Sequence, residues 1–201
     1  VLLPKEDAAL FHAVEGAAMG WFAMSEDEMF DSGGAYGHID RKFTGYRAGK
    51  FREQLEVRAT AEGGLYPQPE TPPKMDVLLL QLLRKLDGWA RRLLTHISHD
   101  VGAPGFFEGL LDPPLPEAPL PPPPGAEDEG EEAVPTLGHP LIRLCKYDCE
   151  TEGVYGTDVL CEAHNDVGFL TLDACASTAG LEAMRRADGV RTLRVKPWQR
   201  E

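Results

Sequence analysis

The prediction for this chain starts from residues 161–173, CEAHNDVGFLTLD, in which polar residues lead into an apolar run. Side chains two residues apart on an extended strand point to the same face. We expect residues 164–172 to form such a strand, so that His164 and Asp166 present an imidazole and a carboxylate side by side. Apolar side chains follow on both faces, which predicts a strand that is covered on both sides.

The segments on either side of this stretch also predict strands. Upstream, residues 141–149 alternate, so one face of the expected strand carries Arg143, Cys145 and Tyr147. Downstream, residues 180–197 contain Asp188-Gly189, a dipeptide typical of tight hairpin turns. Several short strands with tight turns favour a sandwich or jelly roll over residues 139–201, rather than a parallel sheet.

Residues 1–111 are expected to be mainly helical. Apolar residues recur at helical spacing in 6–24 and again in 74–99, and Ser25 is placed to cap a short helix between them. Residues 33–49 are rich in Gly and Tyr and are expected to be a loop, whereas 51–58 could form a strand. The fold class that we expect is α+β, with a helical N-terminal part packed on a partial double-stranded β-helix (jelly roll).

Residues 112–138 are expected to be a linker or a surface insertion. The segment is rich in proline, which removes backbone donors, and it includes a run of five carboxylates, AEDEGEE. The formal net charge of −13 disfavours a nucleic-acid partner, and the longest apolar run is too polar to span a membrane. The four cysteines form no CxxC pair, so we expect free thiols and a cytoplasmic location. We also expect a monomer.

A histidine and an aspartate on one strand face supply two of the three ligands of a facial triad. That 2-His-1-carboxylate arrangement leaves open positions on Fe(II), which a co-substrate and O₂ can occupy. His164 and Asp166 are therefore the candidate metal ligands.

The chain resembles the isopenicillin-N-synthase-like oxygenases, which depend on Fe(II) and 2-oxoglutarate. The resemblance is carried by HNDVGFLTL, then GLEAM, ADG and VKP in the family's order, by LIRLCKYD upstream, and more loosely by WFAMSEDEM and TGYRAGKFREQLEVR. It implies a dioxygenase that oxidises a small organic substrate while 2-oxoglutarate is decarboxylated to succinate. It also implies that Tyr147 binds the 2-oxoglutarate carboxylate, and that His164 and Asp166 hold the iron.

The sequence departs from the family pattern in two places. The asparagine usual two residues before the tyrosine is Cys145 here, and no histidine follows Asp166. The family's second histidine and its Arg-x-Ser clamp are therefore expected beyond residue 201, in a longer protein. We expect the 201-residue chain alone to bind Fe(II) weakly and to turn over little.

Two other functions compete with this interpretation. Cys145, Cys149, Cys161 and His164 could form a structural Cys₃His zinc site. Alternatively, a non-catalytic scaffold of the same fold could bind a protein partner through its acidic, Pro-rich segment 112–138. Other histidines have structural interpretations: His38-Ile39-Asp40 is expected in a surface loop, and His96 and His99 near a helix C-terminus, where they suit the helix dipole. His139 could in principle replace the missing metal ligand.

Overall fold

The computed structural model describes residues 5–49, 52–117, 135–147, 166, 168–173, 182–185 and 191–194. The chain divides into two compact units, residues 1–164 and 165–201. The described residues of the first unit form α1 (Lys5–Trp21), α2 (Glu26–Gly33), β1 (Gly37–Ile39), β2 (Lys42–Arg47), β3 (Arg52–Thr60), β4 (Leu65–Tyr66), α3 (Met75–Asp100) and β5 (Leu137–Tyr147). Those of the second unit form β6 (Glu182–Arg185) and β7 (Arg191–Arg194).

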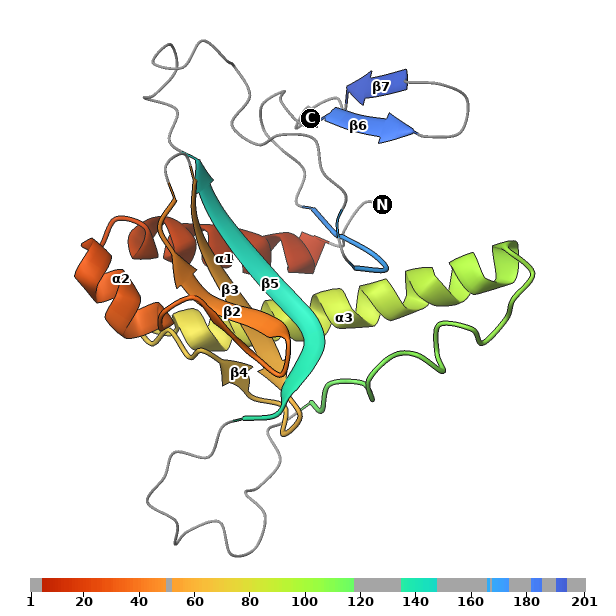
Figure 1. Cartoon of the computed structure of the whole chain (residues 1–201), viewed down its shortest axis with the longest axis horizontal. Helices are drawn as coiled ribbons and strands as arrows, with labels where there is room; N and C mark the ends of the chain where they lie inside the picture. Colours follow the sequence, from red (N-terminus) through yellow and green to blue (C-terminus); the bar gives the residue numbers. More distant parts are fainter. Residues whose placement is uncertain are drawn as a thin grey trace, which may run out of the picture. The chain divides into compact units, whose positions relative to one another are not determined.

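The sheet of the first unit is antiparallel and is organised around β3. Along one side of β3, β2 pairs with its first half and β4 with its second half, and β1 pairs with β2. Along the other side, β5 pairs with β3 from Arg52↔Tyr147 to Thr60↔Leu137, with an irregularity near Thr60. Figure 1 shows that the sheet is curled and that α1 and α3 both lie behind it.

The hydrophobic core lies between one face of this sheet and the helices. Alternate residues of β3, Leu55, Val57 and Ala59, are fully buried there. They meet the buried helix side chains Val14, Trp21, Met29, Met75, Leu79, Leu82 and Leu83. Since successive side chains of a strand point to opposite faces, the other residues of β3 lie on the face away from the helices.

The three helices form where the sequence predicts them. At Ser25 the expected cap is a complete capping box: the Ser25 hydroxyl accepts from the Glu28 backbone N–H at 3.4 Å, and Glu28 Oε2 accepts from the Ser25 N–H at 2.9 Å. These two bonds satisfy donors that the first turn of a helix leaves unpaired. In α3 the buried leucines at 79, 82 and 83 follow helical spacing, so one side of the helix faces the core.

The loop expected over residues 33–49 is wrong, because β1 and β2 form a hairpin there. The two residues between the strands, Asp40 and Arg41, both have positive φ, at 52° and 64°. Positive φ at both central residues is the requirement of the type I′ turn, which usually contains Asn-Gly or Asp-Gly. Because the two residues here are Asp-Arg, the sequence does not indicate this turn. His38 therefore lies in a strand, exposed, rather than in a surface loop.

The strand expected over residues 164–172 is also wrong where it is described. Residues 166 and 168–173 are irregular, with a bend at Gly168 and Phe169. The Thr171 hydroxyl donates to Asp166 Oδ2 at 2.5 Å, across five residues. Five residues of extended strand span about 16 Å, so this contact requires the segment to fold back. Phe169 is 61% exposed, whereas coverage on both faces was expected.

The hairpin predicted for residues 180–197 is confirmed in its strands. β6 pairs antiparallel with β7 from Glu182↔Arg194 to Arg185↔Arg191. The turn dipeptide Asp188-Gly189 lies outside the described residues. The α+β class is confirmed, while the jelly roll and the division of the chain at 111/112 and 138/139 stay predictions.

Asp112, the first residue of the predicted linker, is hydrogen-bonded to His139 of β5. Asp112 Oδ2 accepts from the backbone N–H of His139 and lies 2.7 Å from its Nδ1. Partial burial raises the pKa of Asp112, but these hydrogen bonds outweigh it and hold the pKa below its ordinary value. Leu115 packs against the core nearby. Among the described helices, none has the length and apolar character needed to cross a membrane.

Candidate functional site

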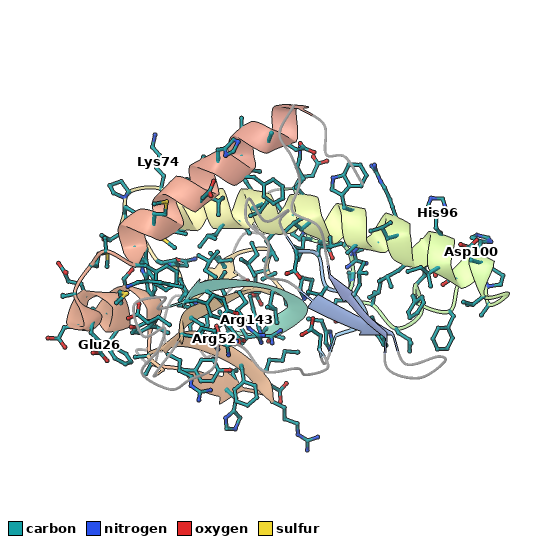
Figure 2. The ribbon with its side chains drawn as sticks, turned by 90° about the horizontal axis from the view of Figure 1, so that it is seen from above. Glu26, Arg52, Lys74, His96, Asp100 and Arg143 are labelled. Carbon is teal, nitrogen blue, oxygen red and sulfur yellow. The ribbon has the colours of Figure 1, made fainter. Side chains whose placement is uncertain are left out.

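The sheet face turned away from the helices is polar, and we call it the polar face. Strand register places its members on β2, β3 and β5. Figure 2 labels two of them, Arg52 and Arg143, on the sheet, with α1 and α3 on its other side. Its members are Phe43, Arg47, Arg52, Gln54, Glu56, Arg58, Arg143, Cys145 and Tyr147.

Glu56 lies at the centre of the polar face and is 1% exposed. Its Oε1 accepts three hydrogen bonds, from Arg143 Nε at 2.8 Å, Gln54 Nε2 at 3.1 Å and the Tyr36 hydroxyl at 3.4 Å. Its Oε2 is buried without a hydrogen-bond partner among the described residues. A buried carboxylate is stable only when it is paired and hydrogen-bonded, and this network supplies both requirements through one oxygen.

Arg58 joins three strands beneath this network. Its Nε donates to the carbonyl of Phe43 at 2.6 Å and its Nη1 to the carbonyl of His139 at 3.0 Å. Burial lowers the pKa of Arg58, and the nearby Glu56 carboxylate opposes that shift. Because arginine keeps its proton under physiological conditions, Arg58 contributes a fixed positive charge to the polar face.

Among the described residues, Arg143 is held differently, through its Nε alone. That nitrogen binds Glu56, and the side chain is 39% exposed. The guanidinium has two further nitrogens in a rigid planar fork that matches a carboxylate. No hydrogen bond to those terminal nitrogens is formed by any residue that the structure describes. The buried carboxylate therefore orients an arginine whose outer edge can bind a ligand.

Tyr36 connects this ion pair to an aromatic surface. Burial raises the pKa of its hydroxyl, and the Glu56 charge raises it further, so the phenol stays protonated and donates. Its ring stacks on Phe43, with ring centroids 5.4 Å apart and an interplanar angle of 4°. On the same ring, the Arg47 guanidinium lies 5.8 Å from the centroid. Phe43 is 49% exposed, so an apolar surface lies beside the charged groups.

The structure places the predicted residues of β5 together. Arg143, Cys145 and Tyr147 share the polar face, as the sequence predicts, since they pair with Glu56, Gln54 and Arg52. Tyr147 is 38% exposed at the end of the strand. Cys145 is half-buried on the same strand.

The predicted iron ligands are described only in part. Asp166 belongs to the second unit and is exposed. His164 lies outside the described residues, so the expected pairing of its imidazole with Asp166 stays a prediction. The same holds for the zinc alternative, because Cys149, Cys161 and His164 all lie outside them. The described residues contain no group of three potential metal ligands.

The other histidines have partners or positions of their own. His139 lies beside Asp112, as described above, and the ring of His38 lies 5.8 Å from that of Phe43. His99 is in the last turn of α3, the position expected for a histidine that interacts with the helix dipole.

The sequence-based prediction missed Glu56, Tyr36 and the arginines of β3. A signal for them exists in residues 52–58, REQLEVR. There Arg52, Gln54, Glu56 and Arg58 occupy every second position, and the apolar Leu55 and Val57 lie between them. That alternation predicts one polar face. Its burial could not be predicted from the strand alone.

No family model, curated protein or solved structure matches this chain. Function is therefore inferred from the chemistry of the residues themselves. The polar face combines four arginines with one carboxylate, a protonated phenol and an exposed aromatic ring. Such a surface is suited to binding a small anionic molecule with fixed, preorganised donors.

Proposed function

We propose that this protein is a non-haem Fe(II)- and 2-oxoglutarate-dependent oxygenase that oxidises a small organic substrate. The observation that carries the proposal is the register of β5 on β3, which puts Tyr147 on the polar face of a helix-backed antiparallel sheet. A tyrosine at this point, followed in the sequence by His164-x-Asp166, is the order in which the resembling oxygenases use these residue types.

The residues present fit the chemistry of the metal and its co-substrate. Asp166 offers an exposed carboxylate, which suits a divalent iron, and a neutral His164 imidazole would be its partner ligand. Tyr147 offers a partly exposed phenol opposite Arg52, a donor and a cation that suit the carboxylates of 2-oxoglutarate. Bound Fe(II) would supply O₂ activation coupled to decarboxylation of the co-substrate.

Within this proposal the residues of the chain have separate tasks. The Asp166 carboxylate would compensate the metal charge, while the Thr171 hydroxyl orients this carboxylate through Oδ2. Tyr147 donates its hydroxyl proton in a hydrogen bond to the co-substrate carboxylate and so orients it. Thr171 and Tyr147 are thus positioning groups.

Replacing Asp166 with alanine is expected to weaken Fe(II) binding at least tenfold, since removal of even an outer-shell partner costs about 10–100-fold. Binding is measured by anaerobic calorimetry on the 201-residue chain, whose affinity is itself expected to be weak. The matched control is Asp173→Ala, which removes another exposed carboxylate of the same segment and should change the affinity less than twofold.

Equal affinities for Asp166→Ala and wild type would contradict the proposal. Stoichiometric zinc that is lost on Cys145→Ser would instead favour the structural zinc site. Tight one-to-one iron together with 2-oxoglutarate-dependent O₂ consumption would support the function while refuting the expectation that this chain alone is nearly inactive.

Replacing Tyr147 with phenylalanine is expected to weaken 2-oxoglutarate binding about tenfold at saturating Fe(II), because one hydrogen bond to a charged group contributes about 1.5 kcal/mol or more. Tyr66→Phe is the matched control, since Tyr66 is similarly exposed, at 36% compared with 38%, but lies on β4. The visible charge-transfer absorption of the ternary complex reports the binding. An unchanged affinity in Tyr147→Phe would remove the co-substrate role from β5.

A further inference from the structure

The polar face concentrates positive charge in a chain that is strongly acidic. The formal net charge of the protein is −13, yet the residues that β2, β3 and β5 present on this face include one carboxylate, Glu56, against four arginines, Arg47, Arg52, Arg58 and Arg143. Local charge of one sign attracts ligands of the opposite sign regardless of the net charge. The acidic composition therefore does not disfavour an anionic ligand at this face.

The charged groups of the polar face act on one another and form one site. The charges of Glu56, Arg143 and Arg47 all affect the ionisation of Tyr36, and those of Glu56 and Arg143 affect Arg58. One carboxylate oxygen of Glu56 accepts three hydrogen bonds, and one of them, from Nε of Arg143, holds that side of the guanidinium in place. A guanidinium held in this way loses little conformational entropy when its outer edge binds a carboxylate.

The aromatic pair beside these charges defines the rest of the ligand. Phe43 and Tyr36 are stacked, and about half of Phe43 is exposed. Tyr36 also hydrogen-bonds to Glu56, so the stacked rings and the Arg143 guanidinium share one carboxylate as a common neighbour. A molecule with an anionic end and a flat apolar body can contact both.

We infer that the polar face binds a small aromatic or flat apolar carboxylate, held by the terminal nitrogens of Arg143, with its apolar body on the Tyr36–Phe43 stack. That this ligand is the substrate to be oxidised rests on the proposed function, whereas the binding itself requires no metal. The role of Arg143 is to bind the carboxylate, and the role of Glu56 is to orient Arg143.

Benzoate is the probe, with benzamide as its neutral isostere, each titrated by calorimetry into the metal-free 201-residue chain at low ionic strength. We expect benzoate to bind at least tenfold more tightly than benzamide. Arg143→Gln should weaken benzoate binding at least tenfold, because charge-assisted hydrogen bonds to the carboxylate are lost. Arg92→Gln, which removes one exposed arginine from α3, should change it less than twofold.

Arg143→Gln leaves Glu56 without its cationic partner and could unfold the chain, so the double variant Glu56→Gln/Arg143→Gln is measured as well. Its two neutral amides can hydrogen-bond to each other, and it is expected to fold and still not to bind benzoate. The inference is overturned if wild type does not bind benzoate, if benzamide binds equally well, or if the folded double variant retains wild-type affinity.

The two proposals fail separately. Metal-free Asp166→Ala should bind benzoate as wild type does, because the inferred contacts come from Arg143, Tyr36 and Phe43. If Fe(II) binding proves independent of Asp166 while benzoate binding depends on Arg143, the polar face is a binding site without the oxygenase. If Fe(II) binding depends on Asp166 while benzoate binding does not depend on Arg143, the oxygenase proposal stands and the carboxylate site is refuted.

Discussion

Replacing Trp21 with alanine is expected to lower the free energy of unfolding by about 3–5 kcal/mol, the range for truncating a large buried aromatic side chain. Trp21 is fully buried at the end of α1. Its ring makes edge-to-face contacts with Phe22 at 5.0 Å and Tyr46 at 5.2 Å, and its indole N–H donates to the Ser32 hydroxyl at 3.3 Å. The cavity would open at the point where α1, α2 and β2 meet.

Urea unfolding followed by far-ultraviolet circular dichroism measures this loss, and Trp89→Ala is the matched control. Trp89 is half-buried on α3, so its truncation should cost distinctly less. A loss of several kcal/mol is a large fraction of the 5–15 kcal/mol that stabilises an ordinary domain. Similar losses for the two variants would mean that Trp21 is not central to the core.

Replacing Gly45 with alanine is expected to cost about 3 kcal/mol or more, because two penalties combine. Gly45 has a φ of 100°, which L-residues with a Cβ rarely adopt. A Cβ at this position would lie 2.5 Å from the carbonyl oxygen of Ala35, a backbone atom. That backbone is held by hydrogen bonds on both sides, from Tyr46 N–H to Gly34 and from Tyr36 N–H to Tyr46. The clash therefore cannot be relieved cheaply.

The same variant should also affect the polar face, because Tyr36 directly follows the residue that the Cβ would displace. Gly16→Ala is the control: Gly16 is helical, and a Cβ added there meets nothing within 4 Å. That change should raise the stability by about 0.5–1 kcal/mol. Urea unfolding of both variants gives the comparison, and a Gly45→Ala protein as stable as wild type would show that segment 34–36 can move aside.

Elements whose signals are local could be predicted from the sequence. The leucines of α3 fix its buried side by spacing alone, and Ser25 with Glu28 marks the start of α2 within four residues. The alternation in β5 likewise predicts that Arg143, Cys145 and Tyr147 share a face. In each case the decisive information lies within one helical turn or a few strand residues.

Features that depend on distant partners could not be predicted in this way. Glu56 is buried because it meets Tyr36, 20 residues away, and Arg143, 87 residues away. The segment from Asp166 to Asp173 has the apolar pattern of a strand, yet its described residues are irregular and Thr171 hydrogen-bonds to Asp166. The sequence therefore predicts the part of the polar face that β5 carries, but not its assembly with β2 and β3 around Glu56.

The alternation along β3 also limits how the sheet can go wrong during folding. A slip of one residue against its neighbours would turn Glu56 and Arg58 towards the helices and expose Leu55 and Val57. Each buried charge would lose its partners, which costs several kcal/mol. Misregistered pairings of this central strand are therefore strongly disfavoured. The ion network that we assign to ligand binding thus also stabilises the correct register of β3 relative to shifted ones.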